Sequence, residues 1–412
     1  MIVDRFAPTR FGPGFRWLMA SSWSTNLGDG IAASAGPLLV ASLTSNPLAV
    51  SGAALLAWAP PLILSLWAGV LSDRVDRRRI MLTGNVVRLA VLAALVTLLA
   101  TGLATVTSVL ISLALLAVAE VFVDNTQATL LPMLVAPGDL LTANARLRFG
   151  SITLNNMAGP ALGALLFAAG RVWPVVTQAV LVLAGVLLIS RLHLPPLSRR
   201  PPSRTWSDVA EGLRWTWAHP AVRTLALTIL IFNLTYGAAW SILVLYATER
   251  LHVGPAGFGL LSTAGALGGL AGTAAYGRIT ARVSLGTIMR AGLLIETFTH
   301  LALALTTSLW PALVILFVMG AHAFIWGTTS TAIRQRAVPL SFQGRVNAVY
   351  VMGLYGGLVI GSALGGVLAT HFGVLAPFWF AFAGSALFVA LLWRQMPLIA
   401  HTSPPSEPMP AS

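Results

Sequence analysis

Long apolar runs alternate with short polar gaps along the whole of this 412-residue chain. An α-helix needs about twenty apolar residues to cross the hydrocarbon layer of a membrane, and each run is about that long. The pattern predicts about twelve membrane-spanning helices, with centres near residues 29, 60, 90, 119, 158, 184, 234, 267, 297, 322, 357 and 385. We therefore expect an all-α polytopic membrane protein.

The positive charges are sorted between the gaps. All 25 basic residues are Arg. When the predicted helices are threaded back and forth across a membrane, 23 Arg fall on one side, Arg88 among them, and only Arg171 and Arg250 fall on the other. Loops on the cytosolic side of a membrane protein retain positive charge. Both termini are therefore expected in the cytosol, with the protein in the cytoplasmic (inner) membrane of a bacterium.

Composition supports this assignment and narrows the partners. The chain is 57% hydrophobic and 9% charged, with a mean hydropathy of +0.83, which exceeds what a soluble domain of this length carries. The formal charge of +13 lies in short loops beside apolar helices, so we expect membrane lipids as partners and no nucleic acid. The absence of Cys excludes disulfides, thiolate metal sites and cysteine nucleophiles.

One long polar gap divides the predicted helices into two groups of six. It runs from Pro195 to Pro220 and, after a Pro-rich stretch, carries apolar residues at helical spacing. We interpret it as a linker with an amphipathic helix at the cytosolic membrane surface, and an early start of the seventh helix is the alternative. We therefore expect a first bundle at residues 1–194, the linker at 195–220, a second bundle at 221–396 and a disordered tail at 397–412.

The two predicted bundles repeat parts of each other in sequence. Segment 69–81 aligns with 277–289 at an offset of 208 positions, each in the gap after the second helix of a bundle. Segment 159–163 aligns with 361–365 at an offset of 202, each in the fifth helix. Two repeated bundles of like orientation are typical of a rocking transporter whose substrate site lies near the membrane midplane.

The segment 69–79 reads Gly-Val-Leu-Ser-Asp-Arg-Val-Asp-Arg-Arg-Arg. It resembles the signature loop of the major facilitator superfamily, G-x-L-x-D-R-x-G-R-R, and departs from it at Asp76, where the superfamily prefers Gly. The resemblance implies a conformational gate that includes the following residues: Gly69, Asp73, Arg74, Arg77 and Arg78. It also implies that Asp73 meets the start of the helix near Arg345 and Val346, at the positive end of the helix dipole. An Arg cluster that only anchors the topology is the alternative.

A second motif lies in the predicted fifth helix, where residues 159–163 read Gly-Pro-Ala-Leu-Gly. This motif resembles the antiporter motif of the superfamily's exporters. Small residues one turn apart let two helices approach closely, and proline bends a helix, so Gly159, Pro160 and Gly163 are expected to join the gate. With segments 28–30, 119–145 and 344–346, the chain is similar to the drug:proton antiporter branch, which includes macrolide-efflux and siderophore-export proteins. We expect a two-bundle transporter of the major facilitator fold that functions as a monomer.

Four carboxylates fall inside the predicted spans, namely Asp29, Glu120, Asp124 and Glu296. A charge at the bilayer centre costs about 2.5–3.5 kcal/mol on insertion scales, unless the group is neutralised, paired or faces a wet cavity. A buried acid can therefore load and release a proton as its access to water changes. We predict that all four take part in proton coupling, with Asp29 and Glu120 as the main carriers. A permanently protonated acid in a static hydrogen bond is the alternative.

The predicted contacts with substrate are polar or aromatic residues inside the spans: Asn26, Asn125, Gln127, Tyr236, Trp240, His322 and Trp326. Aromatic rings offer a stacking surface for an organic compound, although rings at this density also pack helices or face lipid. Glu296 and His300 lie one helical turn apart, and imidazole titrates close to neutral pH. A Glu–His relay is one interpretation of this pair, and a histidine bonded to a backbone carbonyl is the other.

These features predict a proton-coupled secondary transporter that exports an amphipathic organic compound, drug-like or siderophore-like, by alternating access. An uptake symporter or a facilitator of a small organic solute is the main alternative. ATP as the energy source is disfavoured, because a Walker loop needs a Lys and the chain has none. An integral membrane enzyme is the remote alternative, since the sequence has neither H-E-x-x-H nor G-x-S-x-G. We expect no enzyme activity, no cofactor and no metal site.

Overall fold

The protein is helical throughout the part of the chain that can be described. The computed structural model describes residues 11–192 and 205–395, and no strand occurs within these ranges. Nine helices in this part are long and apolar enough to cross a membrane, and two shorter apolar helices accompany them, Trp173–Ile189 and Ala376–Leu392. Each of the twelve predicted centres lies within a helix, so the prediction of an all-α polytopic protein is confirmed. The predicted tail at 397–412 and the first part of the predicted linker lie outside the described residues.

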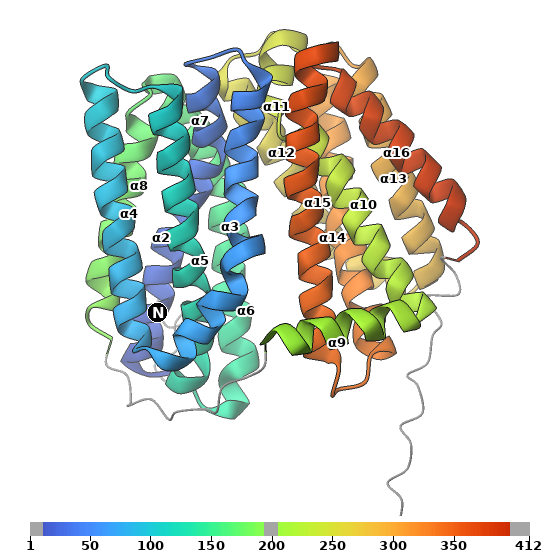
Figure 1. Cartoon of the computed structure of the whole chain (residues 1–412), viewed down its shortest axis with the longest axis horizontal. Helices are drawn as coiled ribbons and strands as arrows, with labels where there is room; N and C mark the ends of the chain where they lie inside the picture. The colour runs from blue at the N-terminus through green and yellow to red at the C-terminus, as the bar shows by residue number, and fades with distance from the viewer. Residues whose placement is uncertain (1–10, 193–204, 396–412) are drawn as a thin grey trace, which may run out of the picture. The chain divides into compact units, whose positions relative to one another are not determined.

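The chain divides into two compact units. The first comprises Met1–Pro202 and Val253–Thr263, and the second comprises Ser203–His252 and Ala264–Ser412. Figure 1 labels the helices, from α2 in blue to α16 in red. The helices of the first part of the chain are α2 (Gly12–Ala41), α3 (Pro47–Arg74), α4 (Arg77–Ala100), α5 (Val106–Leu134), α6 (Leu140–Gly150), α7 (Gly159–Ala169) and α8 (Trp173–Ile189), with η2 (Pro137–Asp139) and η3 (Ser151–Ala158) between them.

The later helices begin with an amphipathic one, α9, at Thr205–Ala218. The remainder are α10 (Pro220–Trp240), α11 (Leu243–Leu245), η4 (Tyr246–Arg250), α12 (Pro255–Thr280), α13 (Leu285–Leu305), α14 (Leu309–Ala337), α15 (Gln343–Phe372) and α16 (Ala376–Leu392). In the second unit, α10 packs along α15, and α13 packs against both α14 and α16. In the first unit, α2 packs against α7 and α8, and α5 packs against α3 and α4.

The turn between α3 and α4 explains why Asp can replace Gly in the signature loop. Asp76 is the N-cap of α4, and its side chain accepts a hydrogen bond of 3.0 Å from the backbone N–H of Arg79. A capping Asp satisfies one of the free amide groups at a helix start, and this contributes about 0.5–2 kcal/mol. The backbone of Asp76 has φ −53° and ψ 117°, which an ordinary residue adopts without strain. Asp76, which replaces the Gly of the superfamily pattern, therefore caps the start of α4 and does not disrupt the turn.

Glycines let α2 and α7 approach until their backbones touch. A Cβ atom on Gly159 would lie 2.5 Å from the Cα of Gly30. A Cβ atom on Gly163 would lie 2.4 Å from both the carbonyl oxygen of Ile31 and the Oγ of Ser34. Real Cβ atoms do not come this close to other atoms, so these positions require glycine.

The sequence repeat of this motif packs in the same way within the second unit. A Cβ atom on Gly361 of α15 would lie 2.1 Å from the carbonyl oxygen of Leu234, and one on Gly365 would lie 2.2 Å from that of Ala238. Both carbonyls belong to α10. Thus the first and fifth helices of each predicted bundle are packed closely by equivalent glycines.

The backbone before Gly159 is irregular. Residues Ser151–Ala158 form the π-helical segment η3, which continues directly into α7. Pro160, which was expected to bend the helix, lies just after this π-helical segment as the second residue of α7. Short π-helical segments within α-helices are frequent at functional sites, and this one lies beside α2.

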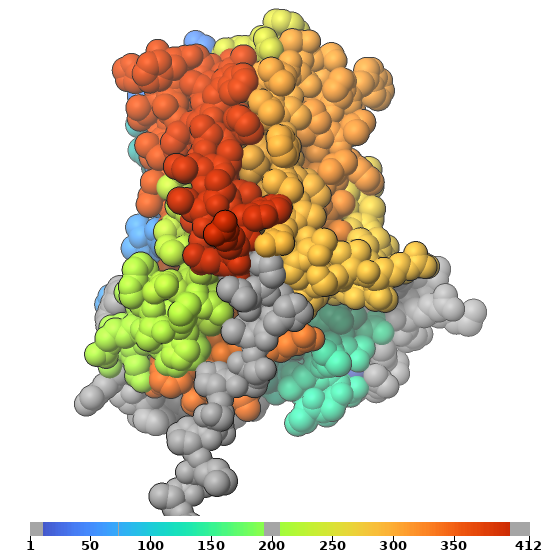
Figure 2. All heavy atoms as spheres, turned by 90° about the vertical axis from the view of Figure 1, so that its right-hand side faces the viewer, coloured from blue at the N-terminus to red at the C-terminus, as the bar shows by residue number. Residues whose placement is uncertain are grey.

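The outer surface of the second unit is apolar. Figure 2 shows α16 in red beside α13 in gold. The side chains of Trp379, Leu387 and Leu391 on α16 and of Phe298 on α13 are exposed by 43% to 66%. A continuous apolar face of this kind, on helices whose backbone groups are bonded internally, fits a hydrocarbon environment.

Because α2 and α7 are in contact at Gly163, adding one methyl group at this position should lower the stability of the protein. Gly163→Ala should lower the midpoint temperature of thermal unfolding of the purified protein, because overpacking a close contact costs about 1–3 kcal/mol. Gly69→Ala is the matched control, since a Cβ there meets no atom within 4 Å and alanine favours a helix by roughly 0.5–1 kcal/mol. Equal stability of the two variants would show that α2 and α7 are not packed as described.

Candidate functional site

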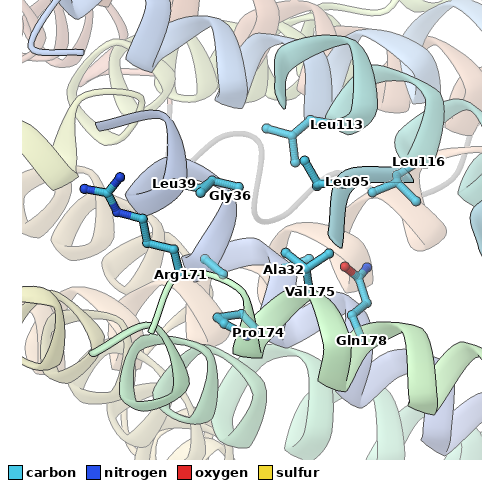
Figure 3. Close-up of a pocket in the computed structure, with 11 residues that line it drawn as sticks. Ala32, Gly36, Leu39, Leu95, Leu113, Leu116, Arg171, Pro174, Val175 and Gln178 are labelled. Carbon is cyan, nitrogen blue, oxygen red and sulfur yellow. The ribbon is translucent and has the colours of Figure 1, made fainter. Parts of the chain in front are cut away.

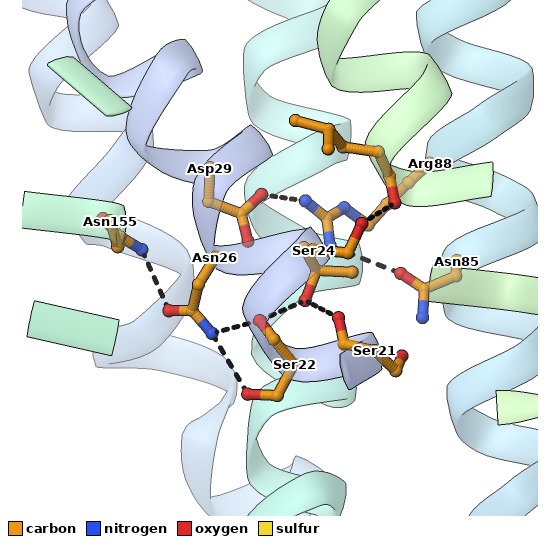
Figure 4. Close-up of polar contacts among 10 residues, drawn as sticks. Ser21, Ser22, Ser24, Asn26, Asp29, Asn85, Arg88 and Asn155 are labelled. Carbon is orange, nitrogen blue, oxygen red and sulfur yellow. Dashed lines mark hydrogen bonds and ion pairs between the residues drawn. The ribbon is translucent and has the colours of Figure 1, made fainter. Parts of the chain in front are cut away.

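Hydroxyl groups on one face of α2 tie it to α8. Ser21 Oγ donates to the carbonyl oxygen of Gly185 at 3.0 Å, and Ser24 Oγ donates to that of Leu181 at 2.8 Å. Figure 4 shows these contacts next to the more polar groups further along the same helix. The polar face of α2 therefore lies inside the first unit, with its position fixed by hydrogen bonds to a neighbouring backbone.

Amide side chains from three helical segments meet around Ser22 and Asn26. Asn26 Nδ2 donates to the Ser22 carbonyl oxygen at 2.8 Å, and Gln127 Nε2 of α5 donates to Ser22 Oγ at 2.9 Å. Asn155 Nδ2 of η3 donates to Asn26 Oδ1 at 3.4 Å. The structure thus brings together the predicted residues Asn26 and Gln127. It places Asn125 outside this network, because its amide donates at 2.8 Å to the Val121 carbonyl of its own helix.

The main feature of the first unit is a buried ion pair between α2 and α4. The Arg88 guanidinium donates to Asp29 Oδ1, and their side chains are only 1% and 9% exposed. Asn85, one turn before Arg88, accepts from Arg88 Nη1 at 3.3 Å (Figure 4). The Gln178 amide of α8 also interacts with the Asp29 carboxylate. Asp29 is therefore paired and hydrogen-bonded rather than isolated.

The position of Arg88 corrects the assignment of the positive charges. Arg88 was counted with the cytosolic loops, but it lies eleven residues after the start of α4, or about 16 Å along the helix axis. The charge count was misleading because the apolar run of this span begins at Ile80, close to three loop arginines. Its spacing of three residues from Asn85 on one helix face is a signal that could have pointed to an inward position.

Glu120 and Asp124 of α5 belong to the same electrostatic cluster. Both carboxylates interact electrostatically with Arg88, as Asp29 does. Asp29 and Glu120 are both half-buried, whereas Asp124 is exposed and is therefore the most accessible of the three acids. Neither makes a hydrogen bond or a direct ion pair with another described residue. We call these four residues, Asp29, Arg88, Glu120 and Asp124, the charged cluster.

A small cavity lies beside the charged cluster, between α2, α4, α5 and α8 (Figure 3). Its volume is about 20 Å³, enough for roughly one water molecule. Gln178, which interacts with Asp29, lines it together with apolar side chains that include Leu95 and Leu116. This cavity is too small for an organic substrate.

The second unit contains a separate buried polar group. Glu296 Oε2 lies 3.3 Å from His322 Nε2 of α14, and Glu296 Oε1 lies 3.6 Å from His300 Nε2. Two predicted aromatic residues of α10 lie nearby, because the Trp240 ring meets the His300 ring edge-on at 6.0 Å and stacks on Tyr236 at 4.2 Å. In the part of the chain that the structure describes, no group of three or more His, Asp or Glu residues has an arrangement that could hold a metal ion.

Trp326 lies one turn after His322 on α14 and is 8% exposed. Its indole Nε1 has no hydrogen-bond partner among the described residues. The predicted residues of the second unit, Tyr236, Trp240, His322 and Trp326, are therefore near the predicted acid Glu296, which the sequence could not show.

The arginines of the signature loop make contacts within the first unit. Arg77 Nη1 lies 3.0 Å from Met133 Sδ of α5, and the Arg78 guanidinium donates to the carbonyl oxygen of Ser190. These contacts join the start of α4 to the ends of α5 and α8. Arg74 is exposed at the end of α3, and the side chain of Asp73 lies outside the described residues.

Arg345, which was expected near Asp73, has partners in its own unit. Its guanidinium donates to Asp208 Oδ1 at 3.1 Å and to Glu211 Oε1 at 3.4 Å, both on α9. The two helices are also in close contact, since a Cβ on Gly212 would lie 2.6 Å from the Arg345 carbonyl oxygen. The amphipathic helix α9 is thus clamped to the start of α15.

Comparison with known proteins identifies the family. The model of the transmembrane secretion effector family matches residues 3–411. The chain belongs to this family of major facilitator superfamily transporters. It is a transporter of the efflux type and not an enzyme.

Two relatives of this transmembrane secretion effector are multidrug efflux pumps. The chain is 28% identical over 388 residues to the multidrug efflux pump Tap of Mycolicibacterium fortuitum, covering 90% of this chain and 92% of the relative. It is 27% identical over 379 residues to the pump of the same name from Mycobacterium tuberculosis, covering 89% of each chain.

Solved structures confirm the predicted major facilitator fold. The chain superposes on a bacterial homologue of the iron transporter ferroportin with a TM-score of 0.75 and 16% identity, covering 93% of this chain and 98% of the other. The nucleoside transporter NupG, as its D323A mutant, gives a TM-score of 0.74 and 11% identity, covering 93% and 99%. At these identities the likeness concerns the fold alone.

The buried ion pair predicts a compensating double variant. Arg88→Gln should lower the midpoint of thermal unfolding, because removing one partner of a buried ion pair costs about 3–5 kcal/mol. Adding Asp29→Asn should restore most of the loss, since no unpaired charge then remains. Arg74→Gln, at an exposed position, serves as the control and should unfold like the parental protein. A double variant no more stable than Arg88→Gln would contradict the pairing.

Proposed function

We propose that this protein is a proton-coupled exporter of amphipathic organic compounds that works by alternating access. Two observations support the proposal. The relatives with nearly full coverage are named multidrug efflux pumps, and the first unit holds three acidic residues around one buried Arg in apolar helices. The group of three acids around one Arg supports proton coupling in particular, because three carboxylates and one guanidinium cannot be neutral together unless protons are bound.

Charge balance gives the coupling mechanism. Arg88 can neutralise one carboxylate of the charged cluster, and a further ionised carboxylate at this depth costs about 2.5–3.5 kcal/mol. The two remaining acids, Glu120 and Asp124, are therefore each expected to carry a proton while Arg88 is paired with Asp29. The Nε–H of Arg88 has no hydrogen-bond partner among the described residues, so the guanidinium retains a free donor for another acid.

Transfer of the guanidinium between acids is the step we assign to the transport cycle. When Asp29 takes up the proton that Glu120 gives up, its attraction to Arg88 falls, and Arg88 can pair with the ionised Glu120 instead. Return of the proton to Glu120 reverses the exchange. In this scheme Asp29 and Glu120 are the carriers, Asp124 is the accessible acid through which water reaches the cluster, and Arg88 is the positioning residue.

The substrate is proposed to contact both polar and aromatic groups. Asn26 and Gln127 offer amides next to the charged cluster, and Tyr236 and Trp240 offer stacked rings in the second unit. An amphipathic organic compound has both kinds of surface, because its rings stack on aromatic side chains and its polar groups accept or donate hydrogen bonds. His322 and Trp326 are the further proposed contacts on the second unit, and Glu296, beside His322, is proposed to take part in proton coupling.

The gate is proposed to use two motifs of the first unit. Gly159, Pro160 and Gly163 set how closely α7 lies against α2, immediately beside Asp29. The signature loop, with Gly69, Asp73, Arg74, Arg77 and Arg78, joins the ends of α4, α5 and α8 through its arginines. We also propose that this loop and both termini face the cytosol of a bacterium, with lipids around a single functional chain.

Transport in everted membrane vesicles tests this function. In everted vesicles the cytosolic face of the membrane is outside, so export corresponds to movement into the lumen. When the interior is acidic, protons leaving the lumen should drive ethidium inward, and parental vesicles should accumulate the dye. Asp29→Asn and Glu120→Gln should each lower the initial rate of accumulation at least about tenfold, since neither amide can exchange a proton. Glu249→Gln, at the end of η4, is a matched carboxylate control and should transport at the parental rate.

Several results would contradict the proposal. Accumulation at the parental rate in both cluster variants would exclude the coupling mechanism. Accumulation that requires an alkaline interior would instead indicate uptake. A panel of toxic organic compounds, tested by growth of an expressing efflux-deficient host, extends the test if ethidium is not a substrate.

A further inference from the structure

The second unit holds a carboxylate between two histidines. Glu296 Oε2 lies 3.3 Å from His322 Nε2, and Glu296 Oε1 lies 3.6 Å from His300 Nε2. All three residues are buried: Glu296 is 6% exposed, His322 is 7% exposed and His300 is 0% exposed. Glu296 and His300 lie in the middle and later turns of α13, and His322 lies in the middle of α14.

Close packing of α13 and α14 fixes this arrangement. Gly292 lies one turn before Glu296, and a Cβ atom there would lie 2.8 Å from His322 Cε1 and 2.6 Å from Trp326 Cδ1. The imidazole of His322 therefore rests directly on the backbone of α13. Because the ring has no room to turn toward that backbone, its Nε2 stays directed at the Glu296 carboxylate.

The His300 ring has no conventional partner. Neither Nδ1 nor Nε2 makes a hydrogen bond with a described residue, although the side chain is fully buried. Leaving a buried polar group unpaired costs about 1–3 kcal/mol. A protonated ring 3.6 Å from a carboxylate oxygen recovers part of this cost through ionic attraction. The placement therefore suits a ring that changes its charge, more than one that stays neutral.

Few other charges face this group. Tyr236 of α10 interacts electrostatically with Glu296, and the span of α16, which also packs on α13, contains no acidic or basic residue. Arg290 of α13 is half-buried and donates to the Trp393 carbonyl oxygen at 2.9 Å. Arg334 lies three turns beyond His322 on α14, about 18 Å along the axis. Glu296 thus has no guanidinium partner, in contrast to Asp29.

We propose that Glu296, His300 and His322 form a second proton-binding site, in which one exchangeable proton resides on the imidazoles. A lone ionised carboxylate in a membrane span is costly, and one imidazolium beside it makes the group neutral overall. Imidazole is the side chain whose charge changes between pH 5 and 8. His300 offers the same proton an alternative position on its own ring, next to the other carboxylate oxygen of Glu296.

This site differs chemically from the charged cluster. A permanent cation balances Asp29 in the first unit, whereas a titratable one balances Glu296 in the second. The role of the site in transport rests on the proposed function, but its proton occupancy does not. Trp240 and Trp326 wall the site, so a substrate that stacks on either ring meets a group whose charge depends on pH.

Nitrogen NMR of the histidine rings tests the proposal directly. The purified full-length protein, labelled with ¹⁵N-histidine and held in lipid nanodiscs, is titrated between pH 5 and 8. The chain has seven His, and the signals of the two buried rings are assigned by their loss in His300→Gln and His322→Gln. We expect imidazolium shifts for at least one of these rings, and loss of that charged form in Glu296→Gln.

Two controls separate a proton site from general damage. Glu296→Asp retains a carboxylate and should keep the charged imidazole signal, and Glu249→Gln removes a carboxylate elsewhere and should leave it unchanged. Neutral tautomers for both rings across the whole pH range would overturn the proposal. A titration in Glu296→Gln identical to that of the parental protein would overturn it as well.

Vesicle transport then distinguishes this site from the proposed function. If the histidine titration is present but ethidium accumulation does not depend on a proton gradient, the proton site stands and the proton-coupled function fails. If both hold, His300→Gln should alter the pH dependence of accumulation without reducing its maximum by more than about threefold. Loss of the histidine titration with intact proton-driven accumulation would remove the second site and leave the function standing.

Discussion

A guanidinium buried among apolar helices must be neutralised where it lies, and this requirement organises the first unit. Arg88 cannot reach water from the middle of α4, so Asp29 on α2 has to be placed against it. Removing two charges from water costs several kcal/mol for each ion, and this is offset only if the pair has good geometry and further hydrogen bonds. Asn85 accepts one such hydrogen bond from Arg88, and the Gln178 amide interacts with Asp29. Glu120 and Asp124 then add acids that Arg88 cannot neutralise at the same time, which turns a structural pair into a group that needs protons.

Helix packing holds the pair in place. Gly30, Gly159 and Gly163 bring the backbones of α2 and α7 into contact directly beside Asp29, and serine hydroxyls bind α2 to α8. The same glycine contacts recur between α10 and α15 in the second unit, where α10 carries no acid. There the carboxylate lies on α13 and faces histidines. The two units thus repeat a way of packing helices, while the chemistry built on it differs between them.

The sequence predicted the helices well because a span needs only a run of apolar residues, and the hydrocarbon layer fixes its length. The glycine contacts were also predictable, since small residues one turn apart have few other uses in such helices. The ion pair was not. Arg88 follows a loop rich in arginine, so the charge count assigned it to that loop, and the packing of α4 against its neighbours shows that it faces inward. The partners of Arg345 on α9 were missed for the same reason, because contacts between distant segments leave no mark on a single sequence.

The protonation of the charged cluster is the central claim, and infrared spectroscopy measures it most directly. Difference spectra of the purified protein, recorded as pH is changed, report the carbonyl stretch of protonated carboxyl groups. We expect a titrating band that disappears in Glu120→Gln and an additional band in Arg88→Gln, where Asp29 loses its cation and takes up a proton. Spectra that are the same in the parental protein and both variants would contradict it.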